Sequence, residues 1–253
     1  MATLKGHSSI IRAIQFSPGG QHLLTGSHDS TCRVWSPHTR ACLQEVYCGG
    51  QVWTVAWRDD ATFLAGSSDG TISQWTVGDE TKAAVEMKAH QVWVWSISWN
   101  PTSRLLASGG SDKLVMVWAP DSQTPLARLP GHQDMVCEVV WSPGDQDVLA
   151  SWDAGGEIRL WSLAGRSCLH TLKTDKDSLA TYTWQTSNIT FSPDGLLLAS
   201  RGREVKVWRV ATGEVAAVCQ VEGGRVAWSR EGDRLAVVTK EDWKFKNISL
   251  FNM

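Results

Sequence analysis

The chain lacks the features that mark membrane proteins, disulfide-stabilised proteins and most nucleic-acid binders. No apolar run approaches the ~18 residues of a membrane helix, and the start, MATLKGHSS, has no signal-peptide stretch. The six cysteines form no CxxC pair, which argues against zinc and thioredoxin-like chemistry. A net charge of −2 provides no basic excess for nucleic acid. We therefore expect a protein of the cytoplasm or nucleus that has no membrane contact and does not bind nucleic acid directly.

Enzyme motifs are missing as well. The sequence contains no GxSxG, HExxH or P-loop motif and no paired carboxylates of a catalytic type. The histidines His22, His28, His38 and His170 lack the spacing of metal ligands. We expect no catalytic activity, no cofactor, no metal and no small-molecule substrate.

Tryptophan, in contrast, is abundant, with 15 residues in a chain of 253. Short apolar runs end on an aromatic residue six times, at Trp35, Trp75, Trp118, Trp161, Trp208 and Phe251. The gaps between these aromatics are 40, 43, 43, 47 and 43 residues. A fixed period of this size indicates a repeat architecture.

The third repeat illustrates the strand pattern within one period. Apolar, β-prone runs occupy 92–99, 104–109, 114–118 and 125–132, and turn residues separate them. Four short strands per period, with little helical periodicity, are typical of a four-stranded propeller blade. The sequence predicts an all-β fold in which residues 1–253 form a single domain.

The turn residues resemble those of the WD40 family. The first repeat has Gly6-His7 before its first strand, Phe16-Ser17-Pro18 at the end of that strand, then Asp29 and the closing Trp35. Six such repeats in register cover nearly the whole chain. The resemblance implies a WD40 β-propeller.

The resemblance also implies buried hydrogen-bonded sets of His, Ser or Thr, Asp and Trp, because a buried carboxylate is costly unless it is paired. The complete sets are His7, Thr25, Asp29 and Trp35, and His90, Ser108, Asp112 and Trp118. In the second repeat Cys48-Gly49 replaces Gly-His and Ala65 replaces the Ser or Thr, although Asp69 remains. We expect that blade to be less rigid.

The two ends of the chain each carry part of a blade. Residues 2–7 are expected to form an outer strand, and the run ending at Phe251 an inner one. Their pairing would close six four-stranded blades and protect the sheet edges. An alternative is an incomplete propeller whose missing blade a partner supplies.

Six tryptophans have no place in the repeat signature, and three of them converge on one predicted opening. Aligned on the end of each first strand, the residues at the mouth of the central channel include Arg12, Trp53, Trp93, Trp95, Met135 and Glu222. Trp93 and Trp95 resemble the aromatic pair that clasps an arginine side chain in the WD-repeat subunit of histone H3 lysine methyltransferase complexes. An indole face attracts a guanidinium.

Together these features predict a non-catalytic scaffold that binds other proteins at its top face and channel mouth, as part of a multi-subunit complex. An alternative interpretation of the indoles is that they plug the channel or pack among themselves. An alternative function is the WD subunit of an RNA-processing or mRNA-export assembly, because the last repeat loosely resembles repeats of that group.

Overall fold

The computed structural model describes the chain except for residues 1–2, 80–82, 146, 175–188, 221–222, 242–243 and 253. The described part consists of strands and turns, and it includes no helix that could span a bilayer. It forms two compact units, Met1–Pro130 (unit 1) and Gly131–Met253 (unit 2). The expectation that residues 1–253 form one domain stays a prediction.

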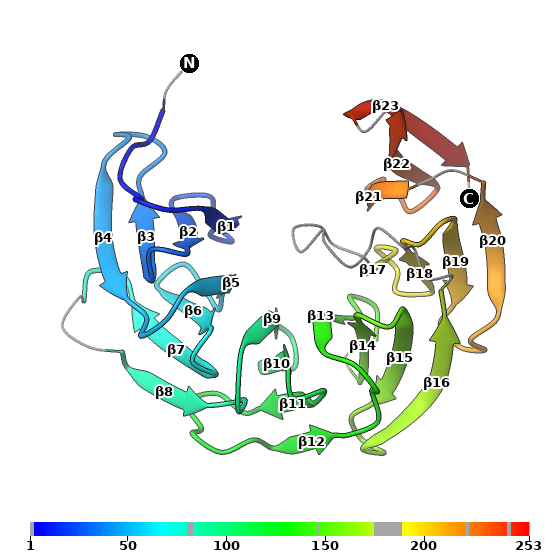
Figure 1. Cartoon of the computed structure of the whole chain (residues 1–253), viewed down its shortest axis with the longest axis horizontal. Coiled ribbons are helices and arrows are strands. Elements are labelled where there is room, and N and C mark those ends of the chain that lie inside the picture. The colour runs from blue at the N-terminus through cyan, green and yellow to red at the C-terminus, as the bar shows by residue number, and fades with distance from the viewer. Residues whose placement is uncertain are drawn as a thin grey trace. The chain divides into compact units, whose positions relative to one another are not determined.

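Unit 1 contains three four-stranded antiparallel sheets, in which each strand pairs with the next along the chain (Figure 1). The first sheet has β1 (Ile11–Phe16), β2 (Leu23–Ser27), β3 (Thr31–Trp35) and β4 (Cys42–Tyr47). The second has β5 (Val52–Trp57), β6 (Thr62–Ser67), β7 (Thr71–Thr76) and β8 (Val85–Lys88). The third has β9 (Val94–Asn100), β10 (Leu105–Gly110), β11 (Val115–Trp118) and β12 (Ala127–Leu129).

Unit 2 repeats this pattern. Its first sheet has β13 (Val136–Trp141), β14 (Val148–Asp153), β15 (Glu157–Ser162) and β16 (Ser167–Lys173). Its second has β17 (Ile189–Phe191), β18 (Leu197–Ser200), β19 (Val205–Arg209) and β20 (Val215–Cys219). Its third has β21 (Gly223–Trp228), β22 (Arg234–Glu241) and β23 (Lys244–Asn252).

The last sheet differs from the other five because its described residues form three strands, in the order β21-β22-β23. Residues 3–10 form no strand, so the outer strand expected at residues 2–7 is not formed in this structure. The segment is held elsewhere, since His7 hydrogen-bonds to Asp29 and Thr25 of the first sheet. Closure by pairing of the two chain ends stays a prediction.

The sheets within each unit are joined through their apolar faces. Leu24 and Val34 of the first sheet pack with Val52 and Phe63 of the second, and all four side chains are fully buried. Burying such aliphatic and aromatic groups contributes about 1.5–3 kcal/mol for each side chain.

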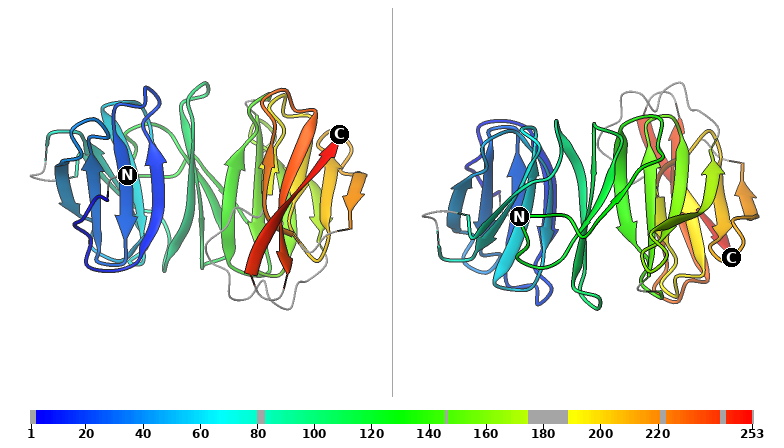
Figure 2. Two further views of the ribbon diagram at one scale, coloured as in Figure 1. Left: turned by 90° about the horizontal axis from the view of Figure 1, so that it is seen from above. Right: turned by 90° about the horizontal axis from the view of Figure 1, so that it is seen from below.

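The first strands of neighbouring sheets lie next to each other. The Trp57 indole N–H donates to the carbonyl oxygen of Gln15 at 3.0 Å, which joins β5 to β1. In unit 2, the Trp228 indole makes the same bond from β21 to Thr190 of β17, at 3.1 Å. Most strands of a unit run along a common direction, so the turns gather at their two ends (Figure 2). This arrangement brings the starts of β1, β5 and β9 to one end of unit 1.

Candidate partner-binding site

A β-bulge lies near the start of the first strand of every sheet in unit 1. In β1, Ile11 pairs with Ser27 and Ala13 with Gly26, so Arg12 is left without a partner on β2. The same shift makes Trp53 the extra residue of a bulge in β5 and Trp95 the extra residue of a bulge in β9. A bulge changes the direction of the side chain at the extra residue. The three bulges therefore fall on three of the residues predicted at the channel mouth.

The three indoles are in direct contact. The ring centroid of Trp53 lies 5.2 Å from that of Trp93, in a stacked arrangement, and 4.6 Å from that of Trp95. Trp93 and Trp95 meet edge to face at 5.1 Å. We call Trp53, Trp93 and Trp95 the aromatic cluster. Offset and edge-to-face contacts of this kind are the preferred arrangements of aromatic rings.

A basic pair, Arg12 and His28, also contacts Trp53. The guanidinium carbon of Arg12 lies 4.6 Å from the Trp53 ring centroid, and the His28 ring lies 4.6 Å from the same indole. Arg12 Nε donates a hydrogen bond to His28 Nε2 at 2.8 Å, so His28 must carry its proton on Nδ1. Burial, and then the positive charge of Arg12, lower the pKa of His28 and favour this neutral form.

The indole N–H groups of Trp95 and Trp53 differ in their hydrogen bonding. The Trp95 indole N–H donates to Ser111 Oγ at 2.7 Å, and the Ser111 amide donates to the carbonyl of Trp93 at 3.0 Å. The Trp53 indole nitrogen is buried and has no hydrogen-bond partner among the residues that the structure describes. Trp95 is thus fixed by both packing and hydrogen bonding, whereas Trp53 is held by packing alone.

Trp93 is the accessible member of the cluster. Its side chain is 37% exposed, whereas that of Trp95 is 8% exposed and Trp53 is half-buried. Val92, which precedes Trp93 in the sequence, and Ile10, which stands two residues before Arg12, are also exposed apolar side chains. A partner would therefore meet Trp93 before it meets the other two indoles.

Unit 1 does not include the other two predicted mouth residues, Met135 and Glu222. Met135 belongs to unit 2, where it is half-buried and precedes β13. Glu222 lies outside the described residues. Trp93 and Trp95 touch each other directly, so in this conformation they do not form two parallel walls around a guanidinium.

Sequence reasoning missed His28 and Ser111 as members of the site. Each immediately precedes the Asp of its β-turn, at Asp29 and Asp112, so they occupy equivalent places in their repeats. That shared position was visible in the alignment of repeats. Their contacts to the first strands were not, because they depend on the bulges.

The two predicted hydrogen-bonded sets are geometrically complete. His7 Nδ1 lies 2.8 Å from Asp29 Oδ2, His7 Nε2 lies 2.7 Å from Thr25 Oγ1, and the Trp35 indole donates to the same oxygen at 2.9 Å. With the proton on Nδ1, His7 donates to the carboxylate and accepts from the Thr25 hydroxyl. Every polar atom in the set then has a partner.

The third repeat builds the same set from β10 and β11. His90 lies 2.8 Å from Asp112 and 2.9 Å from Ser108, and the Trp118 indole donates to Ser108 at 3.0 Å. Burial raises the pKa of Asp112, but hydrogen bonds from His90 and from backbone amides outweigh it and hold the pKa below its usual value. The carboxylate therefore stays ionised inside the fold.

A further set occurs in unit 2, although its Asp stands two places earlier relative to the closing Trp. His132 contacts Asp153 at 3.0 Å and Ser151 at 2.6 Å, and the Trp161 indole donates to Ser151 at 2.7 Å. Asp153 is the last residue of β14, whereas Asp29 and Asp112 lie in the turns that follow β2 and β10. In the second repeat of unit 1, by comparison, the Trp75 indole donates to Ser73 of its own strand instead.

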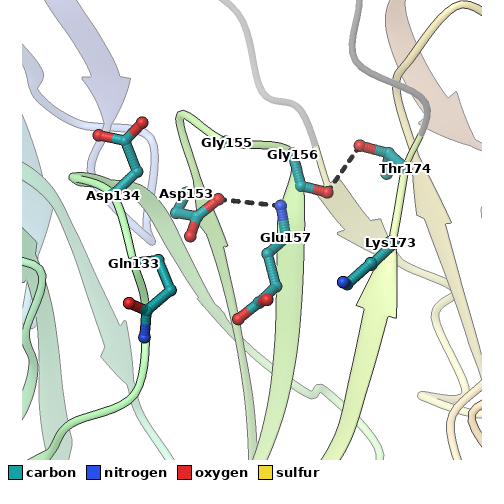
Figure 3. A pocket seen from close by; sticks show the side chains of 8 residues that line it. All are labelled: Gln133, Asp134, Asp153, Gly155, Gly156, Glu157, Lys173 and Thr174. Carbon is teal, nitrogen blue, oxygen red and sulfur yellow. Dashed lines mark hydrogen bonds between the residues drawn. The ribbon is translucent and has the colours of Figure 1, made fainter.

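A pocket of ≈ 440 Å³ lies beside the set of unit 2 (Figure 3). Its lining includes Asp134, Asp153, Glu157 and Lys173. His132, Asp153 and Glu157 have ligand atoms within 4.8 Å of one another, which is a spacing that a metal ion could use. All three are already engaged, however, because His132 and Asp153 bind each other and Glu157 pairs with Arg159 at 2.7 Å. A metal would have to displace structural contacts.

Comparison with known proteins identifies repeats of one family. The model "WD40: WD domain, G-beta repeat" matches residues 1–36, 40–76, 82–119 and 123–162, which is more than half of the chain. A solved structure, "Crystal Structure of Mitotic Checkpoint Complex", has a TM-score of 0.81 and 18% identity over 98% of this chain and 76% of that one. These matches confirm the predicted all-β WD40 propeller fold.

Two kinds of relative share sequence with the chain. "Apoptotic protease-activating factor 1" of Mus musculus is 37% identical over 229 residues, which is 86% of this chain and 18% of that protein. "Ribosome biogenesis protein BOP1" of Mus musculus is 41% identical over 58 residues, which is 23% of this chain and 8% of that protein. The chain spans less than a fifth of either relative.

Proposed function

Because the chain belongs to the WD40 repeat family, we propose that it is a non-catalytic scaffold that binds a segment of a partner protein at the aromatic cluster of unit 1. WD40 propellers are in general interaction modules rather than enzymes. The partner is proposed to be another subunit of a multi-protein complex in the cytoplasm or nucleus.

The observation that carries this proposal is the exposed indole of Trp93. It stacks on Trp53 and contacts Trp95, yet 37% of its side chain remains exposed. Clustered aromatic side chains that stay accessible are more typical of binding surfaces than of ordinary solvent-facing surface. Tryptophan is also among the residues that contribute most to interface energies.

The alternative that the indoles only fill space makes a different prediction. A plug requires all three rings for stability and predicts no loss of binding on their removal. Trp95, which is nearly buried and bonded to Ser111, fits that structural role. Trp93 fits it less well, because 37% of it stays exposed.

Affinity purification of the tagged chain followed by mass spectrometry tests the proposal. The preparation is repeated with Trp93→Ala and with the matched control Tyr47→Ala, which removes an exposed aromatic on β4, outside the cluster. We expect partners retained by the wild type and by Tyr47→Ala to be lost with Trp93→Ala. Equal recovery with all three proteins would overturn the proposal.

The RNA-associated alternative is supported by the BOP1 relatives, whose name refers to ribosome biogenesis and which are 41–51% identical to the chain over stretches of 53–58 residues. Ribonuclease treatment before purification distinguishes the two. Partners that disappear after ribonuclease depend on RNA, whereas partners that persist contact protein.

An incomplete propeller is the other alternative that stays open. The last strand, β23, has no fourth strand beside it among the described residues, and its Leu250 is 67% exposed. An unpaired strand edge is a template for a further strand. Either the start of this chain or a partner segment could supply it, and truncation of the first residues separates the two cases.

A further inference from the structure

We propose that the partner segment presents a carboxylate, and that Arg12 is the residue that recognises it. This inference rests on the proposed function, since it uses the same site. The resemblance to arginine-clasping proteins would predict a positively charged partner side chain. We infer a negatively charged one, because Arg12 of this chain already lies against Trp53 of the aromatic cluster.

The geometry of Arg12 leaves part of its guanidinium available. Nε donates to His28 Nε2 at 2.8 Å, and the guanidinium carbon lies over the Trp53 ring at 4.6 Å from its centroid. The two terminal nitrogens have no hydrogen-bond partner among the described residues and are not buried. A guanidinium that is held over an indole and has both terminal nitrogens accessible is suited to bidentate pairing with a carboxylate.

The surroundings favour an anion over a cation. In the described part of the chain, no carboxylate lies within ion-pair distance of Arg12. An incoming arginine would meet a like charge at this position, and it would find Trp53 already in contact with Arg12 and stacked with Trp93. A carboxylate would meet a cation whose charge is not neutralised nearby.

His28 contributes by positioning Arg12. Its Nε2 accepts the hydrogen bond from Arg12 Nε, and its ring packs against Trp53 at 4.6 Å, so it fixes the rotation of the guanidinium. A pre-oriented arginine loses less conformational entropy on binding than a free one. Trp93 and Val92 offer exposed apolar surface nearby. The expected motif is therefore an acidic residue beside an apolar or aromatic one.

Synthetic heptapeptides test this directly. Four immobilised pools carry Glu, Gln, Arg or Lys at the centre and random residues elsewhere, and retention of the purified chain on each pool is measured. We expect the Glu pool to retain the wild type best. Individual Glu peptides from that pool are then titrated by fluorescence anisotropy.

A double-mutant cycle assigns the contact. Changing the peptide Glu to Gln and changing Arg12→Gln should each weaken binding about tenfold or more, and the two losses should not add. The control Arg128→Gln, on the exposed side of β12, should bind as the wild type does. The peptide substitution leaves the protein intact, so it tests the proposal even if Arg12→Gln folds poorly.

The outcomes separate the two proposals. Preference for the Arg pool, lost with Trp93→Ala, would overturn the carboxylate inference and leave the proposed function standing. If peptides are retained and neither Trp93→Ala nor Arg12→Gln reduces their retention, both proposals are overturned. Failure of all four pools to retain the chain would also overturn both.

Discussion

The guanidinium carbon of Arg12 lies 4.6 Å from the ring centroid of Trp53, although the two residues come from different sheets. Both are the unpaired residues of β-bulges at equivalent places in β1 and β5. Because of this contact, Trp53, Trp93 and Trp95 form a packed surface beside a positive charge. The indole of Trp93 stays accessible to a partner.

Truncating Trp93 and truncating Trp95 should have different effects. Trp93→Ala should weaken partner binding by ~2 kcal/mol or more and change the melting temperature little, because the side chain is exposed. Trp95→Ala should lower the free energy of unfolding by about 3–5 kcal/mol, because it leaves a cavity and strands Ser111. Thermal melts beside binding assays check this. Equal destabilisation by both would identify the pair as a plug.

The hydrogen-bonded sets should stabilise their repeats unequally. Asp112→Ala leaves the His90 donor without its acceptor and should cost about 1–3 kcal/mol. Asp69→Ala should cost less, because Asp69 has no His or Trp partner and contacts only Ser67 and Thr71 among the described hydrogen bonds. Urea denaturation of the two variants gives the comparison, and equal losses would contradict it.

Acid should destabilise the fold through the same carboxylates. The pKa values of Asp29, Asp112 and Asp153 lie below those of free carboxyls, because hydrogen bonds outweigh burial. Groups with a depressed folded-state pKa contribute stability above the unfolded-state pKa of about 3.9. That contribution is lost as the pH falls through the lower folded-state value.

Urea melts between neutral pH and pH 3 test this linkage. The wild type should lose stability steeply below about pH 4. Asp112→Asn cannot titrate at that position, so its stability should start lower and fall less. A variant whose stability fell in parallel with the wild type would show that Asp112 is not responsible.

Removal of the first eight residues tests closure by the chain ends. If residues 2–7 pair with the last sheet, truncation should cost several kcal/mol and expose an edge that promotes self-association. His7 is deleted as well, so His7→Ala is the matched control for loss of its bonds to Asp29 and Thr25. A truncated protein that stays monomeric and melts like His7→Ala would argue that a partner supplies the missing strand.

The sequence determined the strands because their signals are local. The runs predicted at 92–99, 104–109 and 114–118 appear as Val94–Asn100, Leu105–Gly110 and Val115–Trp118. The partners of His90 were predictable for a similar reason, since each repeat places them at fixed separations. Apolar runs and turn residues determine structure over a few positions, so strands and turns can be recognised in the sequence.

Only the tertiary structure decided what the first strands present. A bulge depends on the pairing of two strands, and the meeting of Arg12, Trp53 and Trp95 depends on three sheets packing side by side. The alignment of repeats put these residues at one level but could not show that Arg12 covers Trp53. It also predicted a strand at residues 2–7 that the described residues do not form, because pairing needs an edge that lies far away in the sequence. Contacts between distant segments are set by packing, which no local pattern encodes.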